Sequence, residues 1–214
     1  MTFMRPQIPR VVAGLVFLAL GLALTACGSA PSTRYYLLAP PAMDGMPAEK
    51  PAGQRLGVET FAVDPPYDQS RLVYRIGEGA GEVGFYEHHR WAAEPGRLVS
   101  TALAAGLRHL DGLATAEPAS VVGNYDLILS GRVVSLEEVD LPDRQVARLA
   151  LDLKLYSGSE DTLLWSGFLT AENGGTAADA SDIMGQMQEA FDDLLRQLQG
   201  ELGPAVKAKG EAGG

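Results

Sequence analysis

Two groups of residues have side chains that could do chemistry: a lone cysteine near the N-terminus and a central cluster of aromatic, basic and histidine residues. Cys27 is the only cysteine among 214 residues, so it cannot form a disulfide within the chain. The central cluster reads Tyr86-Glu87-His88-His89-Arg90-Trp91 and contains two of the three histidines. Thiols and imidazoles serve as nucleophiles, proton carriers or metal ligands, so the surrounding sequence has to decide between these roles.

The surroundings of Cys27 are those of a lipid-modified N-terminus. Arg5 and Arg10 precede an apolar run over 11–24, and Leu24-Thr25-Ala26-Cys27 follows directly. A helix of 14 residues spans only about 21 Å, against a hydrocarbon core of about 30 Å. This pattern resembles a bacterial lipobox, in which small residues admit the peptidase and the thiol takes the diacylglycerol. We therefore predict a cleaved signal peptide over 1–26 and an acylated, palmitate-bearing Cys27; an ordinary buried cysteine is the alternative.

The predicted anchor determines where the protein acts. Cleavage after Ala26 removes two arginines and no acidic residue, so the mature chain is more negative than the full chain, whose net charge is −10. Acyl chains, not basic residues, then hold the protein at the membrane. Gly28 stands where lipoproteins of enteric-type bacteria that stay in the inner membrane commonly have aspartate. By resemblance to that sorting rule, we expect the periplasmic face of the outer membrane, with the inner membrane less favoured.

Composition and motifs argue against several classes of function. The negative charge would repel a phosphate backbone, so nucleic acid is not an expected partner. The sequence has no G-x-x-x-x-G-K-[ST] and no G-x-S-x-G motif, and the glycine-rich stretch 77–84 carries two glutamates, which favours a hairpin turn over a phosphate-binding loop. His88 and His89 are adjacent, so on a strand they point to opposite faces and could not easily share one metal ion; packing or partner contact is the favoured role. We expect no catalysis, no metal and no cofactor.

Hydrophobic periodicity predicts an α+β fold: a mainly antiparallel sheet with two amphipathic helices packed on one face, in a single domain. The clearest signal is the alternation of Ala147, Leu149, Leu151, Leu153 and Leu155 with polar residues, typical of a half-buried strand. We expect strands over 33–38, 56–63, 72–76, 85–91, 125–137, 145–156 and 162–171, with helices over 96–110 and 179–199. The domain would then cover 33–203, after a short lipid-anchored linker over 27–32 and before a disordered tail over 204–214.

The order of these pieces resembles the ABC-type transport auxiliary lipoproteins. The lipobox is followed by S-T-R-Y-Y-L-L over 32–38, V-E-T-F-A-V-D-P-P-Y over 58–67 and Y-E-H-H-R-W-A over 86–92, then by a helix and the Tyr125-Asp126-Leu127 strand. The resemblance implies a non-catalytic auxiliary subunit associated with membrane integrity and intermembrane lipid transport. Its implied partners are an MCE-type periplasmic protein and an inner-membrane ABC permease and ATPase.

Two functional alternatives stay open on the sequence. A lipoprotein that activates a periplasmic cell-wall enzyme could have the same anchor, although it usually needs a longer tether; a lipid-anchored hydrolase would lack a recognisable nucleophile motif. For the auxiliary subunit, we predict partner contact through Tyr86, His89, Arg90 and Trp91. Trp, Tyr and Arg dominate binding energy at interfaces, and the same aromatic residues could instead belong to the core.

Overall fold

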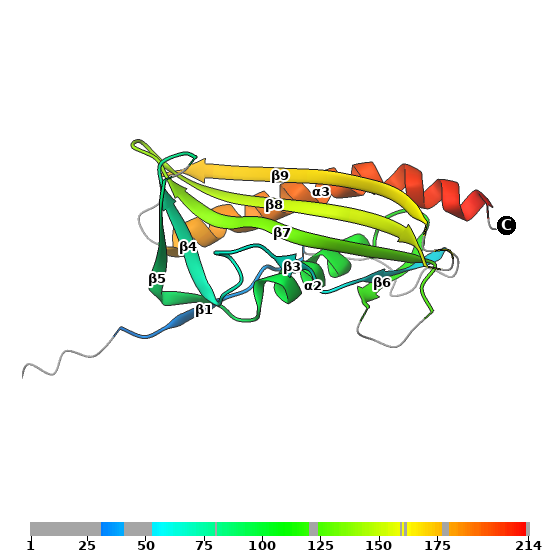
Figure 1. Cartoon of the computed structure of the whole chain (residues 1–214), viewed down its shortest axis with the longest axis horizontal. Coiled ribbons are helices and arrows are strands. Elements are labelled where there is room, and N and C mark those ends of the chain that lie inside the picture. Colours follow the sequence, from blue (N-terminus) through cyan, green and yellow to red (C-terminus); the bar gives the residue numbers. More distant parts are fainter. Residues whose placement is uncertain are drawn as a thin grey trace, which may run out of the picture. The chain divides into compact units, whose positions relative to one another are not determined.

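A long antiparallel meander forms the centre of the domain (Figure 1). Its strands are β7 (Leu127–Asp140), β8 (Gln145–Ser157) and β9 (Leu163–Gly175), and β8 pairs with both neighbours over almost its full length. The structure is a computed structural model that describes residues 31–40, 53–79, 81–119, 124–158, 160, 162–176 and 180–212. The domain forms one compact unit that begins at Thr33.

Three short strands follow one another along the free edge of β7. They are β2 (Gln54–Val58), β3 (Ala62–Val63) and β4 (Arg71–Ile76), all parallel to β7. Beyond β2 lies β6 (Leu113–Pro118), and beyond β4 lies β5 (Glu82–Trp91), which in turn carries β1 (Arg34–Tyr36). In the part of the chain that the structure describes, these strands make one nine-stranded mixed sheet.

This arrangement confirms the predicted α+β class, because the longest pairings, β7 with β8 and β8 with β9, are antiparallel. The parallel pairings were not predicted, nor was β6. Parallel neighbours need a crossover connection, which α2 supplies between β2 and β7. The sequence of β6, Leu-Ala-Thr-Ala-Glu-Pro, has little strand propensity of its own. Its pairing with β2 is therefore what makes it a strand.

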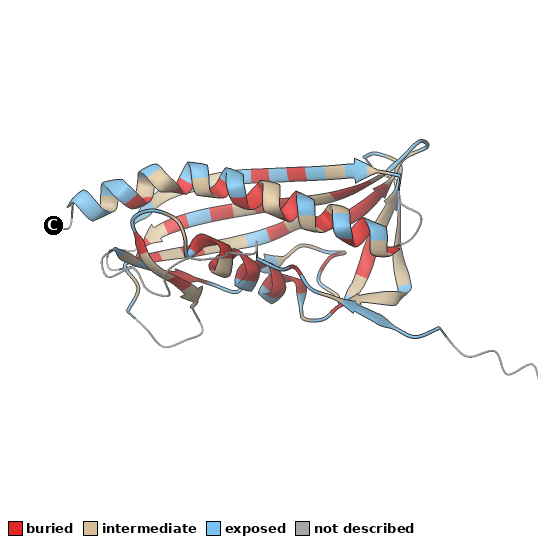
Figure 2. Cartoon of the chain, turned by 180° about the vertical axis from the view of Figure 1, so that it is seen from behind, coloured by how far each residue is buried: buried red, intermediate tan, exposed pale blue. Residues whose placement is uncertain are grey.

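Both helices cover the same face of the sheet, as predicted (Figure 2). Helix α2 (Pro95–Leu107) packs mainly on β6 and β2, and α3 (Ala180–Ala212) packs on β9 and β8. The helices approach each other closely at Gly106, where an added Cβ would overlap the side chain of Leu195. The absence of a side chain at Gly106 therefore allows the two helices to pack in direct contact.

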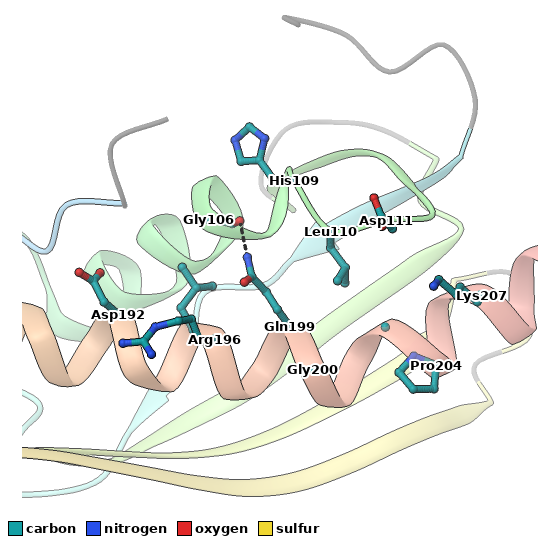
Figure 3. Close-up of a pocket in the computed structure, with 12 residues that line it drawn as sticks. Gly106, His109, Leu110, Asp111, Asp192, Arg196, Gln199, Gly200, Pro204 and Lys207 are labelled. Atoms are coloured by element: carbon teal, nitrogen blue, oxygen red, sulfur yellow. Dashed lines mark hydrogen bonds between the residues drawn. The ribbon is translucent and has the colours of Figure 1, made fainter. Parts of the chain in front are cut away.

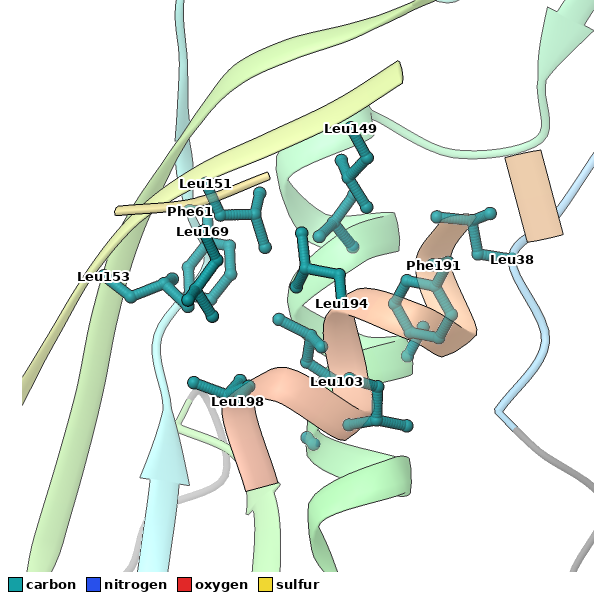
Figure 4. Packing of buried hydrophobic residues seen from close by; sticks show 14 of the residues in the cluster. Leu38, Phe61, Leu103, Leu149, Leu151, Leu153, Leu169, Phe191, Leu194 and Leu198 are labelled. Carbon is teal, nitrogen blue, oxygen red and sulfur yellow. The ribbon is translucent and has the colours of Figure 1, made fainter. Parts of the chain in front are cut away.

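The core lies between α3, α2 and the meander (Figure 4). The inward side chains of β8 are fully buried, including Leu149, Leu151 and Leu153, and they pack with Phe191, Leu194 and Leu198 of α3. On the opposite face of β8, Asp152 pairs with Arg132 of β7 at 3.2 Å. The predicted alternation of buried and polar residues is confirmed.

The C-terminal helix is longer than predicted. We expected a helix over 179–199 and a disordered tail over 204–214, but α3 continues to Ala212 with Pro204 inside it. The predicted helix end was wrong because Val206, only 1% exposed, packs in the core. In addition, Gln54 Nε2 donates a hydrogen bond to the Val206 carbonyl at 3.1 Å. Burial thus outweighs the local cost of glycine and proline.

The glycine-rich stretch is the turn between β4 and β5, as predicted. Gly77 and Gly79 have φ values of 77° and 69°, which L-residues with a side chain rarely adopt. Arg75 donates to the Gly79 carbonyl at 3.1 Å across the turn. Among the described residues, no helix is long and apolar enough to cross a membrane.

Candidate functional site

The predicted aromatic and basic cluster lies at a corner of the sheet, where β1 pairs with the end of β5. The parallel register places Arg34 beside His89, Tyr35 beside Arg90, and Tyr36 beside Trp91. An irregularity in the β4–β5 pairing, between Arg71 and Val73, bends β5 at this point. The side chains of the cluster therefore divide between the two faces of the sheet.

Trp91 belongs to the hydrophobic core. Its side chain is 3% exposed and packs within the buried cluster, and its backbone N–H donates to the Ser70 carbonyl at 2.6 Å. A partner that binds the folded domain has almost no access to this side chain. The structure therefore separates Trp91 from the exposed residues with which the sequence groups it.

Tyr86 and His89 form a polar chain on the helix-covered face. The His89 ring stacks on Tyr36 with centroids 5.7 Å apart, and its Nδ1 is hydrogen-bonded to the Tyr36 hydroxyl at 2.7 Å. Tyr86 meets the His89 ring edge to face and donates its hydroxyl proton to Glu138 at 2.6 Å. These contacts join β7, β5 and β1 in a single row of side chains: Glu138, Tyr86, His89 and Tyr36.

Glu138 is a buried carboxyl group with one described hydrogen-bond donor, Tyr86. Burial is the largest cause of its raised pKa; the Tyr86 hydrogen bond acts in the opposite direction, and the nearby Asp140 adds to the increase. Burial and the Glu138 carboxylate together raise the pKa of Tyr86 as well. The row therefore contains a carboxyl group that is more easily protonated than usual.

A second buried carboxylate lies on the opposite face of the same strand. Glu137 accepts hydrogen bonds from Tyr67 at 2.7 Å and from Arg75 at 3.1 Å, and Arg148 lies 3.8 Å away. Burial, and then Glu137, raise the pKa of Tyr67 to about 12. Two arginines compensate Glu137, so this group is a structural ion-pair network.

Arg90 points to the outer side of the sheet. Its Nη1 donates to Ser70 Oγ at 3.2 Å, and it pairs in register with Arg71 of β4. Arg71 lies over the Phe85 ring at 4.5 Å from the centroid. Of the four residues predicted to contact a partner, Arg90 is the one that presents a charge on this side.

The two adjacent histidines contact different residues. The ring of His88 is about one-third exposed, 3.8 Å from the Glu87 carboxylate, whereas His89 contacts Tyr36 and Tyr86. Among the described residues, there is no group of three or more His, Cys, Asp or Glu side chains that could hold a metal ion.

The N-terminal segment is tied to the first half of α3, which the sequence did not predict. Arg34 donates to Ser181 at 2.9 Å, and the side-chain amide of Gln188 both accepts from the Ala39 N–H at 2.9 Å and donates to the Ala39 carbonyl at 2.8 Å. Leu38 lies in the core between these contacts. Nothing in the local sequence pairs residues 34–39 with 181–188, because the contacts span about 150 residues.

A groove of about 950 Å³ runs between the end of α2 and the middle of α3 (Figure 3). Gln199 crosses it and donates to the Gly106 carbonyl at 3.1 Å, one of the carbonyls that a helix end leaves without a helical partner. The groove contains three glycines and both signs of charge; its lining includes Gly106, His109, Asp111, Asp192, Arg196, Gly200, Gly203 and Lys207. The sequence does not predict this groove, because it forms only where the end of α2 and the middle of α3 come together.

Cys27 and the predicted signal peptide lie outside the described residues. Acylation at this position therefore rests on the sequence pattern, and the anchor stays a prediction. The described domain begins a few residues after it.

The fold and the corner define a class: single-domain α+β proteins with a helix-covered mixed sheet and an N-terminal strand attached at its edge. The model of the family described as "ABC-type transport auxiliary lipoprotein component" matches residues 36–199. The chain belongs to this family, and the resemblance noted in the sequence is confirmed.

Solved structures show the same fold at low sequence identity. Protein XCC0632 from Xanthomonas campestris, of family DUF330, has a TM-score of 0.64 and 16% identity, covering 85% of this chain and 97% of that one. An uncharacterized protein also has a TM-score of 0.64, with 14% identity and coverage of 80% and 99%. A search of curated proteins found no match.

Proposed function

We propose that this protein is a non-catalytic auxiliary subunit of an ABC-type system that moves lipid between membranes, anchored by Cys27 to the periplasmic face of the outer membrane. The observation that carries the proposal is the family match over residues 36–199. The lipobox-like sequence that ends at Cys27 supports it independently. An MCE-type periplasmic protein and an inner-membrane permease and ATPase would be its partners.

The length of the tether fits a subunit that stays beside its membrane. Arg34, at the start of β1, lies seven positions after Cys27, a distance of at most about 24 Å when the chain is fully extended. Tyr86, His89 and Trp91 contribute to docking indirectly in this proposal. They hold β1 on the sheet and so fix the point from which the tether leaves the domain.

The groove between α2 and α3 is the surface that we propose for a partner segment. Glycine along a groove lets another backbone approach closely, and charges of both signs at the rim suit a polypeptide. An added Cβ at Gly200 would have no atom within 4 Å. A larger side chain at this position should fill the groove without disturbing the fold.

Co-purification with the MCE-type partner tests this surface. Gly200→Phe is expected to abolish co-purification, whereas Gly185→Phe is expected to leave it unchanged. Gly185 is the matched control, because it is also exposed on α3 and also has open space around its Cβ position. Equal co-purification of both variants with wild type would reject the groove, and failure of the wild-type chain to co-purify with any MCE-type partner would reject the proposed system.

The anchor has its own test. Mass spectrometry of the mature N-terminus should find acyl chains on Cys27, and a Cys27→Ser variant should lose membrane retention. Separation of inner and outer membranes decides the location. An unmodified Cys27, or wild-type retention of the variant, would contradict the lipoprotein proposal.

A further inference from the structure

Strand β1 and the residues that follow it expose large apolar side chains on the side that faces away from the core. Tyr36 and Leu38 point inward and pack against buried residues, while Tyr35 is 65% exposed and Leu37 is 66% exposed. An edge strand with one solvated face normally carries polar residues there. Exposed neighbouring apolar residues therefore indicate contact with something other than water.

Three arginines lie on nearby strands and on α2. Arg90 is the register partner of Tyr35, and Arg71 is the register partner of Arg90. Arg97 lines a groove of about 310 Å³ together with Leu37, Pro40 and Ala93. Tyr35, Leu37, Arg71, Arg90 and Arg97 are hereafter called the N-terminal patch.

The three arginines of the patch are not compensated by ion pairs in the part of the chain that the structure describes. Within the described residues, Arg71, Arg90 and Arg97 form no ion pair with a carboxylate, and neither do Arg34 and Arg108. The remaining six described arginines do: Arg55, Arg75, Arg132, Arg144, Arg148 and Arg196. The chain has a net charge of −10, so carboxylates are abundant elsewhere. Asp68 and Glu94 line a groove together with Arg97, so the positive charge of the patch is concentrated on Arg71 and Arg90. Positive charge beside exposed apolar groups suits an anionic, apolar partner.

We propose that the N-terminal patch docks on a phospholipid bilayer. Tyr35 and Leu37 enter the headgroup region, and Arg71, Arg90 and Arg97 contact the phosphates of anionic lipids. This inference rests on the proposed function, because acylation of Cys27 holds Tyr35 within about 27 Å of the membrane by chain length alone. Tyrosine is well suited to such a site, since its ring has an apolar body and a polar tip.

Docking would give the tethered domain a fixed orientation. An acyl anchor restrains one point of the chain and leaves the domain free to rotate. A second contact through the patch would turn the sheet corner toward the bilayer and keep the opposite edge strand, β9, away from it. The orientation is therefore the quantity that an experiment should measure.

A site-specific fluorophore measures this orientation in the full lipidated chain. Cys27 is the only native cysteine and is acylated in the proposal, so Leu37→Cys introduces a single reactive thiol. Phe168→Cys is the matched control, because Phe168 is 62% exposed on β9 at the other edge of the sheet. Both labelled proteins are reconstituted in phosphatidylethanolamine vesicles, with or without phosphatidylglycerol, that contain a doxyl-labelled phospholipid quencher.

The proposal predicts strong quenching at position 37 and weak quenching at position 168. Adding Arg71→Gln and Arg90→Gln to the Leu37→Cys protein should lower its ratio of docked to undocked molecules about fivefold per arginine in vesicles with phosphatidylglycerol. The same changes should have little effect without the anionic lipid.

The outcomes separate the patch from the anchor. If the protein floats with the vesicles but the two labels are quenched equally, or neither is quenched, the patch does not dock on lipid. A label at position 37 that is protected only after an MCE-type protein is added would also overturn the proposal, by assigning the patch to a protein partner. If the wild-type chain does not float, the anchor is refuted, and the docking proposal with it.

Discussion

Replacing Trp91 by alanine should destabilise the whole domain, although the sequence places this residue in a cluster suited to binding. Its indole is 3% exposed in the core. Truncation of a buried tryptophan costs about 3–5 kcal/mol, from lost burial and from the cavity that remains. For a domain of this size, that loss corresponds to a decrease in Tm of about 6–20 °C.

Urea unfolding followed by fluorescence measures the free-energy change directly. The chain has two tryptophans, so Trp165 remains as the reporter in the Trp91→Ala variant. Tyr35→Ala is the control, since Tyr35 lies on the neighbouring strand and is 65% exposed; its free energy of unfolding should change by less than about 0.5 kcal/mol.

The result also decides between the two roles of Trp91. If Trp91 is a core residue, binding of the MCE-type partner should decrease only in proportion to the lost folded protein. A loss of stability below about 1 kcal/mol, well short of the expected range, together with lost partner binding, would refute the core assignment. It would show that the indole becomes accessible to a partner.

Three further changes test other parts of the structure. Leu151→Ala on β8 should cost about 2–5 kcal/mol in urea unfolding, and a loss below about 0.5 kcal/mol would mean that the buried face of the strand is misassigned. Val206→Ala should cost about 2 kcal/mol, because Val206 is 1% exposed; an unchanged midpoint would indicate that residues 204–212 do not pack on the domain. Glu138→Gln should remove a pH-dependent contribution to the free energy of unfolding. Burial, opposed by the Tyr86 hydrogen bond, raises the pKa of Glu138 above its ordinary value of 4.5. The stabilising effect of this shift is complete below pH 4.5 and is lost as the pH rises through the raised pKa. The wild-type free energy of unfolding minus that of the variant should therefore fall with increasing pH, and a pH-independent difference would contradict the assignment.

The alternation in β8 shows why some elements could be predicted well. Side chains of a strand point to opposite faces at a period of two, so five alternating apolar residues identify both the strand and its buried face. Helix α2 was predicted from apolar residues at helical spacing, which is also a local pattern. These patterns are local, and the physical preference behind each acts within a few residues.

The corner could not be predicted in the same way. Tyr86, His89, Arg90 and Trp91 are close in sequence, and their types suit an interface or a core equally well. The bend in β5 and the pairing with β1 send Trp91 into the core, Tyr86 and His89 to Glu138 and Tyr36, and Arg90 outward. Which side chains remain accessible depends on a pairing between segments about 50 residues apart.

The sequence by itself determined the lipobox at Cys27, the α+β class and the family, because each rests on residue types at short spacing. The tertiary structure decided the parallel order of the short strands along β7 and the length of α3, whose Pro204 and Gly203 argue locally for a helix end. It also decided that Arg34 and Ala39 are tied to α3 and that Tyr35 and Leu37 are left exposed. These features depend on contacts between distant segments, and the burial of groups such as Val206 outweighs the preference of the local sequence.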